Sequence, residues 1–212
     1  MSETETTGSK YTRHSRDDVV GAALALLDGL GLPDLTMRRL AATLDVQPSA
    51  LYWHFPNKQA LLAAVADQIV ARARPLPAGV SDWMPTARTE ADALRDALLA
   101  FRDSAEVVSS TIALGLGSGE AFARLAGALA IGDFEPETAR RGASALLHFI
   151  LGHVSHEQQR MQADSLGVVT RTHSSNPTDA AAGASGREEF DFGVMLLLAG
   201  LERQPHSARS LS

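Results

Sequence analysis

The chain contains no cysteine, so it forms neither disulfide bonds nor thiolate metal sites, and a reducing compartment is expected. It also lacks long apolar runs. Residues 192–201 form one of the longest, far shorter than the roughly 20 residues that span a bilayer. The opening segment MSETETTGSK is polar without an apolar core, so we do not expect a signal peptide. These absences predict a cytoplasmic protein with no membrane partner.

Signals for β-strands are lacking as well. Apolar and polar residues do not alternate, alanine and leucine dominate, and apolar residues recur at helical spacing, which predicts an all-α fold. Pro75 and Pro77 interrupt this spacing and divide the chain. The predicted parts are a flexible basic arm (1–15), a head of three helices with a connecting helix (16–74), and a helical body (75–212) with a flexible loop at about 164–186.

The net charge of −6 gives no sign of nucleic-acid binding by itself. Residues 1–74, however, contain eight Lys and Arg against eight Asp and Glu, whereas residues 75–212 contain eleven against seventeen. All the excess acid therefore lies in the second part. Electrostatic attraction depends on charges within about 8 Å at physiological salt, so the local patch matters more than the total. Taken alone, the basic residues of the first part are typical of an ordinary solvated surface.

Residues 36–58, TMRRLAATLDVQPSALYWHFPNK, contain signals for two short helices. Thr36 can cap the first helix, because its hydroxyl can accept a hydrogen bond from an amide of the first turn. The second can begin at Pro48, since proline is tolerated at a first helical position. It must end by Phe55, because Pro56 disfavours a helical conformation in the residue before it. About three residues separate the two helices, a spacing that predicts a helix-turn-helix.

In a helix-turn-helix the second helix enters the major groove of DNA, and the first crosses the phosphate backbone. Residues 47–54 form the second helix, with small and polar residues at its start and Tyr52, Trp53 and His54 at its end. Small residues allow a close approach to base edges, while the aromatic groups and Lys58 can donate to phosphates. So short a helix must bury one face, and we therefore expect either Tyr52 or Trp53 to be a core residue.

The segment LYWHFPNKQALL and its surroundings, from about residue 17 to 69, closely resemble the TetR family of bacterial repressors, in particular its tetracycline repressor branch. The resemblance implies that Thr36 and Arg38 contact DNA from the start of the first motif helix. Within the second motif helix it implies that Ser49 and Ala50 read bases, and Gln47 joins them at the start of that helix. The implied backbone or base-step contacts are Tyr52, Trp53, His54 and Lys58.

One departure from the tetracycline repressors concerns Pro48 and Ala50, where those proteins carry glutamine and threonine. An operator of different sequence is therefore expected.

Two helices predicted in the body, at 136–160 and 188–203, are more apolar than a surface helix requires. Residues 194–198 are apolar without interruption, and Ser185 with Glu188 predicts a capping box at the start of that helix. Such helices are buried either in the core of one monomer or in an interface. A symmetric homodimer would bury them in a four-helix bundle, and the family resemblance also implies a dimer.

The resemblance further implies a small-molecule inducer inside the body. The expected ligand-binding set combines apolar lining residues with two histidines as polar handles, a composition typical of small-molecule pockets. Its members are Phe101, Ile112, Phe122, His148, Phe149 and His153. The predicted function is that of a ligand-responsive repressor, which binds a palindromic double-stranded DNA operator as a homodimer and is released by the inducer.

The first alternative to an inducer site in the body is a metal site. His153, His156 and Glu157 have the spacing of neighbours on one helix, and such groups can bind zinc. The chelating histidine of the tetracycline repressors, however, would fall near position 108, where this chain has none. We therefore expect no metal and no cofactor.

Two further alternatives concern the whole protein. An enzyme is the weaker one, because the chain has no nucleophile elbow or HExxH motif. Its glycine-rich segment, residues 115–122, follows no strand and lacks the lysine of a phosphate-binding loop. The other alternative is a DNA-binding dimer that responds to no ligand.

Overall fold

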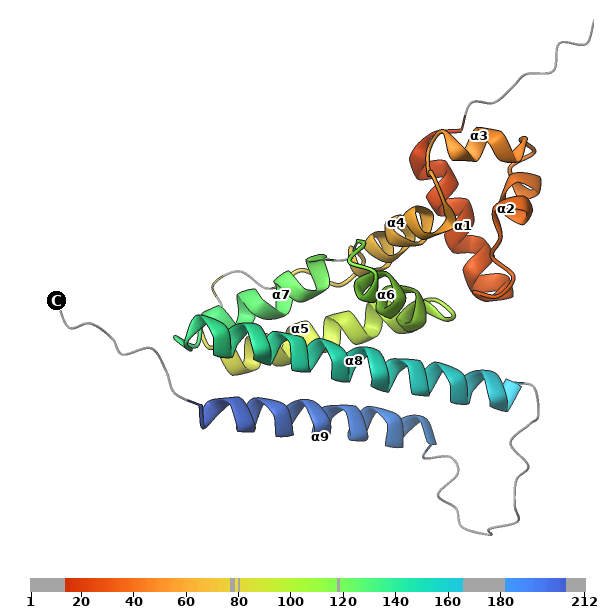
Figure 1. The fold of residues 1–212 in the computed structure, drawn as a ribbon. Helices are drawn as coiled ribbons and strands as arrows, with labels where there is room; N and C mark the ends of the chain where they lie inside the picture. The colour runs from red at the N-terminus through yellow and green to blue at the C-terminus, as the bar shows by residue number, and fades with distance from the viewer. Residues whose placement is uncertain (1–13, 77–78, 80, 118, 166–181, 205–212) are drawn as a thin grey trace, which may run out of the picture.

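The computed structural model describes residues 14–76, 79, 81–117, 119–165 and 182–204, which form helices and turns without a β-strand (Figure 1). The all-α fold predicted from the sequence is confirmed. In chain order the helices are α1 (Arg16–Leu30), α2 (Met37–Thr43), α3 (Pro48–Tyr52), α4 (Lys58–Val70), α5 (Trp83–Leu99), α6 (Ser104–Ala113), α7 (Gly119–Ala130), α8 (Pro136–Ser165) and α9 (Ala182–Glu202).

The helices of the N-terminal head begin where local signals place them. The hydroxyl of Ser15 accepts the amide of Asp18 at 3.1 Å, and the Ser15 amide donates to the Asp18 carboxylate at 2.8 Å. The second of these bonds holds the pKa of that carboxyl below its usual value. Thr36 caps α2, Pro48 is the first residue of α3, and Asn57 caps α4. The predicted starts of α2 at Thr36 and of α3 at Pro48 are confirmed.

The body is built around α5, α7 and α8, and Figure 1 shows α9 running beside α8. Their apolar faces meet in a core that includes Leu94, Leu125, Leu146, Ile150 and Phe190, all less than 2% exposed. The connecting helix α4 leads from the head to the body, where it packs against α6. No helix in the described part of the chain is both long and apolar enough to cross a membrane.

The sequence did not predict α6, and it misplaced the ends of α8 and α9. Asp103 precedes α6 in the left-handed region (φ 54°) and makes no side-chain cap, so the usual start signal is missing. Helix α8 continues to Ser165, and α9 begins at Ala182, which puts Ser185 inside the helix and makes its predicted capping role wrong. Most of the predicted loop, residues 166–181, lies outside the described residues, as does most of the arm 1–15.

Candidate nucleic-acid interface and effector-binding regions

The two arginines of α2 have different surroundings. Arg39 forms an ion pair with Asp34 at 2.6 Å, and its amide donates to the Thr36 hydroxyl at 3.1 Å. Arg38 is exposed, as is Thr36. A guanidinium binds phosphate or guanine best when its planar donors are not already committed to a carboxylate. Because Asp34 neutralises Arg39, Arg38 is the better placed of the two for a DNA contact.

The turn between α2 and α3 is held by main-chain geometry and by one contact from before α1. Asp45 lies in the left-handed region (φ 53°), which short polar residues tolerate better than most. The Val46 amide donates to the Ala41 carbonyl at 3.0 Å. The Nε2 atom of His14 lies 3.0 Å from the Leu44 carbonyl, to which it can donate. These contacts hold α3 at a defined angle to α2.

Helix α3 buries a narrow face and exposes its aromatic end. Leu51 and Phe55 are each 1% exposed, whereas Tyr52 is 51% and Trp53 90% exposed. The expectation that either Tyr52 or Trp53 belongs to the core is therefore wrong. A helix of five residues has few inward positions, and Leu51, with Phe55 just beyond the helix, takes the buried side. An indole left this exposed is a contact group without a partner in the head.

The remaining predicted DNA-binding residues lie on the same stretch of chain. Gln47 precedes α3 without a side-chain capping bond and is exposed, as is Ser49, while Ala50 is half-buried. His54 and Lys58 are half-buried, and Lys58 is the first residue of α4. A helix dipole disfavours a cation at that position, but amides and an ammonium group together favour a phosphate. The start of α4 therefore suits the DNA backbone.

The six expected effector-binding residues are spread over several parts of the body. Phe149 and His153 lie together on α8, with ring centroids 5.6 Å apart, and both pack against Phe190 of α9. His148 lines a groove of about 370 Å³ between α6 and α8. Phe101 lines another groove, of about 260 Å³, beside the last turns of α8. Ile112 and Phe122, the other two, pack against the core as partly buried residues.

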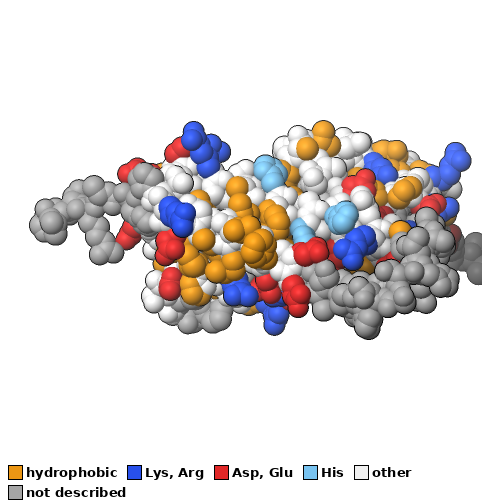
Figure 2. Space-filling model, turned by 90° about the horizontal axis from the view of Figure 1, so that it is seen from below, with side chains coloured by type: hydrophobic (Ala, Val, Ile, Leu, Met, Phe, Trp, Pro, Cys, Tyr) orange, Lys and Arg blue, Asp and Glu red, His pale blue; other side chains and the backbone are white. Residues whose placement is uncertain are grey.

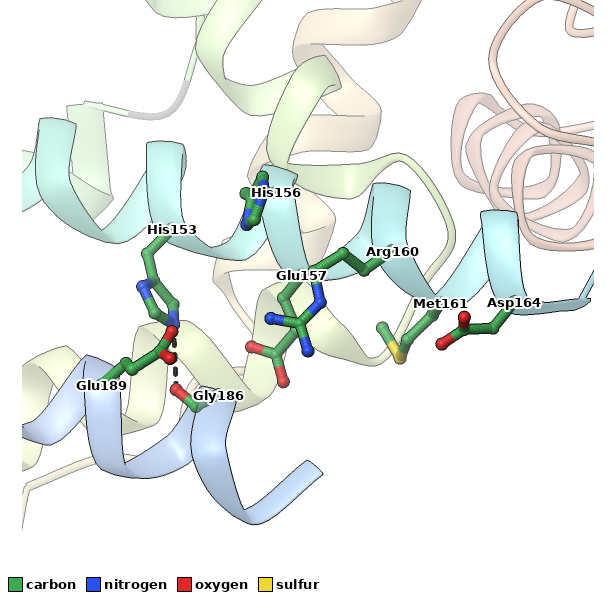
Figure 3. Close-up of a pocket in the computed structure, with 8 residues that line it drawn as sticks. All are labelled: His153, His156, Glu157, Arg160, Met161, Asp164, Gly186 and Glu189. Carbon is green, nitrogen blue, oxygen red and sulfur yellow. Dashed lines mark hydrogen bonds between the residues drawn. The ribbon is translucent and has the colours of Figure 1, made fainter. Parts of the chain in front are cut away.

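His153 also lines a cavity of about 120 Å³ between the second half of α8 and the start of α9 (Figure 3). Its Nε2 lies 3.0 Å from the Gly186 carbonyl, and His156, Glu157 and Glu189 lie around the same space. Drug-sized ligands occupy about 300–1,000 Å³, so this cavity suits only a small polar group. Among the described residues, no group of three or more His, Asp or Glu is placed to hold a metal ion.

The outer face of α8 and α9 carries an exposed apolar patch, visible in Figure 2, which views the molecule from below. Phe192 is 67%, Met195 37% and Leu196 58% exposed. A groove of about 390 Å³ runs between the two helices beside Leu196, and Arg141 lies on its rim. Arg140 and Arg141 donate to the Glu137 carboxylate and lower its pKa to about 2, so this rim stays ion-paired at neutral pH.

Comparison with known sequences matches both parts of the chain. Residues 19–65 match the family model described as bacterial regulatory proteins, tetR family, and residues 76–204 match the tetracyclin repressor-like C-terminal domain. Tetracycline repressor protein class G of Vibrio anguillarum is 33% identical over 210 residues, which cover 91% of this chain and 95% of that protein.

Solved structures agree with this result. The crystal structure of Mycobacterium smegmatis BioQ superposes with a TM-score of 0.79 at 39% identity, over 91% of this chain and 99% of that one. The crystal structure of BioQ with its double-stranded DNA operator superposes with a TM-score of 0.74 at 37% identity, over 90% of this chain and 99% of that one. A variant of TetR from Acinetobacter baumannii AYE in complex with minocycline superposes with a TM-score of 0.69 at 31% identity, over 90% of this chain and 97% of that one.

Proposed function

Because the chain belongs to the TetR family of bacterial regulatory proteins, we propose that it represses transcription by binding a palindromic operator as a homodimer, and that a small-molecule inducer releases it. The observation that carries the DNA-binding part is the exposure of Tyr52 and Trp53 at the end of α3, beside Lys58. A helix-turn-helix whose largest aromatic side chain is 90% exposed presents a contact surface and not a core. Members of this family are regulators, so the enzyme alternative is set aside.

The proposed DNA contacts fall into two classes. Arg38, Gln47, Ser49 and Ala50 lie at the starts of α2 and α3 and read base edges. The contacts to the phosphate backbone come from Thr36, Tyr52, Trp53, His54 and Lys58. Base contacts set the sequence preference, whereas backbone contacts set register and affinity. The crystal structure of the relative BioQ with its operator supports this use of the head.

Lys58 provides a direct test of the backbone contacts. We expect Lys58→Gln to lower operator affinity and to reduce the slope of log K against log salt by roughly 1.8, because each phosphate contact contributes about 0.9 and a dimer loses two. The measurement is a salt titration of operator binding. Arg160→Gln, which removes an exposed cation of α8 outside the proposed dimer groove, is the control and should leave the slope unchanged. An unchanged slope in Lys58→Gln would place this lysine away from the DNA.

The homodimer is proposed to form through the apolar patch on α8 and α9. The patch combines exposed Phe192, Met195 and Leu196 with a groove that can receive side chains from a second copy. Large apolar side chains gathered on one face of a water-exposed surface indicate an interaction site. A palindromic operator has two equal half-sites, and a symmetric dimer places one head on each.

The inducer is proposed to bind the body near the expected set of Phe101, Ile112, Phe122, His148, Phe149 and His153. The minocycline complex of the A. baumannii relative supports a ligand-binding body. The groove beside His148 is the best candidate of the three, because its volume of about 370 Å³ lies within the range of small-molecule sites. To release DNA, the inducer must bind one arrangement of the heads more tightly than the other, and α4 is the lever between head and body.

A thermal-shift screen tests the sensor function. A compound at 100 times its Kd stabilises a protein by about 2.7 kcal/mol, which for a chain of this size raises Tm by roughly 5–10 °C. We expect such a compound to weaken operator binding when it is added to the protein–DNA complex. If every stabilising compound leaves operator affinity unchanged, the body is only a dimerisation module. The alternative of a ligand-free DNA-binding dimer would then be correct.

A further inference from the structure

The chain that leaves α4 is bound by a largely buried side chain of the body, in addition to the exposed ion pair of Arg74 with Asp96 of α5 at 3.0 Å. Arg124 of α7 donates from Nη1 to the carbonyl of Ala73 at 3.3 Å and from Nη2 to the carbonyl of Arg74 at 2.5 Å. Its Nε donates to Glu90 of α5 at 2.7 Å. The side chain of Glu90 is 4% exposed and that of Arg124 14% exposed. One guanidinium therefore ties α5 and α7 to the end of the connecting helix.

The segment that Arg124 holds is the point where the head joins the body. Helix α4 ends at Val70, and the chain continues in tight turns in which the amide of Ala73 donates to the carbonyl of Val70. The Arg72 guanidinium lies over the ring of Phe101, 4.7 Å from its centroid. A cation near a helix C-terminus is favoured by the helix dipole and satisfies carbonyls that lack partners inside the helix.

Stability alone gives little reason for this buried pair. Removing two charges from water costs several kcal/mol each, and well-packed apolar residues in place of a buried ion pair are often as stable or more stable. Unlike an apolar contact, the interaction of this pair depends strongly on the direction from which its partners approach. A guanidinium has donors in a fixed plane. Its three acceptors, on α5 and on the chain after α4, satisfy it only when α5, α7 and the end of α4 have one mutual orientation.

A second polar contact holds the head at another point. The Asp103 carboxylate, at the start of α6, accepts the amide of Leu32, which follows α1, at 2.8 Å. The polar contacts at Leu32 and at the end of α4 therefore hold the head at two separated points, in addition to the packing of α4 against α6. A rotation of the head about the first contact must move the end of α4, which Arg124 resists.

We propose that Arg124 is a positioning residue that fixes the pivot of the DNA-binding head, with Glu90 holding its guanidinium in place. The proposal deepens the proposed repressor function and rests on it for its consequence at the operator. Loss of the Arg124 contacts leaves the end of α4 held mainly by apolar packing, which is less directional, so the head samples several angles on the body. Recognition helices at variable angles then fit two half-sites less well, because their separation must match about one turn of DNA.

The experiment measures head orientation directly. Since the natural chain has no cysteine, spin labels can be attached at Ala25→Cys on α1 and Ala130→Cys on α7, two exposed positions. Labelled chains diluted into unlabelled protein report the distance within one chain. In the variant Glu90→Leu with Arg124→Met, which leaves no unpaired buried charge, we expect a broader distance distribution and an operator affinity at least about tenfold lower, with Tm nearly unchanged.

The matched control is the variant Arg95→Met with Glu157→Leu. This ion pair joins α5 to α8 at 2.8 Å, and its side chains are 8% and 19% exposed. The hydrogen bonds of the Arg95 guanidinium go to Glu157 and not to α4. We expect the distance distribution and operator affinity of this control to match those of the unmodified protein. Equal broadening of the distance distribution in both double variants would mean that loss of any buried ion pair of the body loosens the head. Arg124 would then have no specific positioning role.

A second variant covers the case in which the first does not fold. Arg124→Lys keeps the charge opposite Glu90 but cannot reach a carboxylate and two carbonyls at once, so it should also broaden the distribution. A narrow, unshifted distribution in Arg124→Lys, or in a folded double variant, overturns the proposal. The distance measurement is made without DNA, so a broadened distribution in a protein that binds no operator would instead contradict the repressor function and leave the positioning role intact.

Discussion

Replacement of Leu196 by glutamate is expected to convert the protein into a monomer at micromolar concentration and to abolish tight operator binding. Leu196 is 58% exposed on α9, so a charge there is solvated in the monomer and does not unfold it. In the proposed dimer, the same residue would carry an unpaired charge into the interface from each protomer. A buried uncompensated charge costs about 3–5 kcal/mol, and two would raise the dimer Kd by a factor of about 10⁴ or more.

Analytical ultracentrifugation and operator titration measure the two effects. Leu114→Glu is the matched control, because Leu114 is a 60% exposed leucine just after α6, away from the α8–α9 patch. We expect it to remain dimeric with unchanged operator affinity. Helical circular dichroism should be the same in both variants. A Leu196→Glu protein that stays dimeric, or a monomer that still binds a palindrome tightly, would rule out this interface.

Removal of the aromatic groups at the end of α3 is expected to have the next largest effect. In Tyr52→Ala with Trp53→Ala, operator affinity should fall at least about 100-fold, because each half-site loses two backbone contacts and hydrogen bonds to charged groups contribute about 1.5–3 kcal/mol each. Tm should change little, since Tyr52 is 51% and Trp53 90% exposed. Fluorescence anisotropy with a footprinted operator measures the affinity.

Two further variants test whether the loss of operator affinity is caused by the missing contacts to the DNA backbone. Leu30→Ala shortens another exposed apolar side chain of the head, 44% exposed on α1, and should leave affinity unchanged. Ser49→Ala should instead alter which bases are preferred, because base contacts specify the sequence and backbone contacts only position the protein. Full affinity in the double aromatic variant would show that α3 meets DNA by another face.

Local signals explain why the head could be predicted closely. The Ser15–Asp18 capping box, the caps at Thr36 and Asn57, and the proline at position 48 act within one helical turn, so the residues that decide each start lie next to it. A helix without such a signal was not predicted, and at α9 the apparent capping box of Ser185 and Glu188 was misleading. Helix α6 begins after Asp103 in a left-handed conformation without a side-chain cap, and its start cannot be recognised from neighbouring residues.

Burial on α3 was mispredicted because it depends on distant elements. Adjacent residues of a short helix differ little in local signal, and the face that turns inward is decided by packing with the rest of the head. Leu51 and Phe55 occupy that face, and the Arg16 guanidinium of α1 lies 4.6 Å from the centroid of the Phe55 ring. The sequence pattern places Tyr52 and Trp53 at the end of the helix without showing that both are exposed.

The amino-acid sequence by itself determined the helical class, the helix-turn-helix and the resemblance to TetR repressors, because these depend on spacing and on hydrogen bonds between near neighbours. Tertiary structure alone decided that Phe101, His148 and His153 line different hollows, and that Arg124 meets Glu90 and the carbonyl of Ala73. Glu90 lies 34 positions from Arg124, and Ala73 lies 51 positions away. Ion pairs and cavities of this kind form only where packed helices bring such distant residues together, which no local pattern encodes.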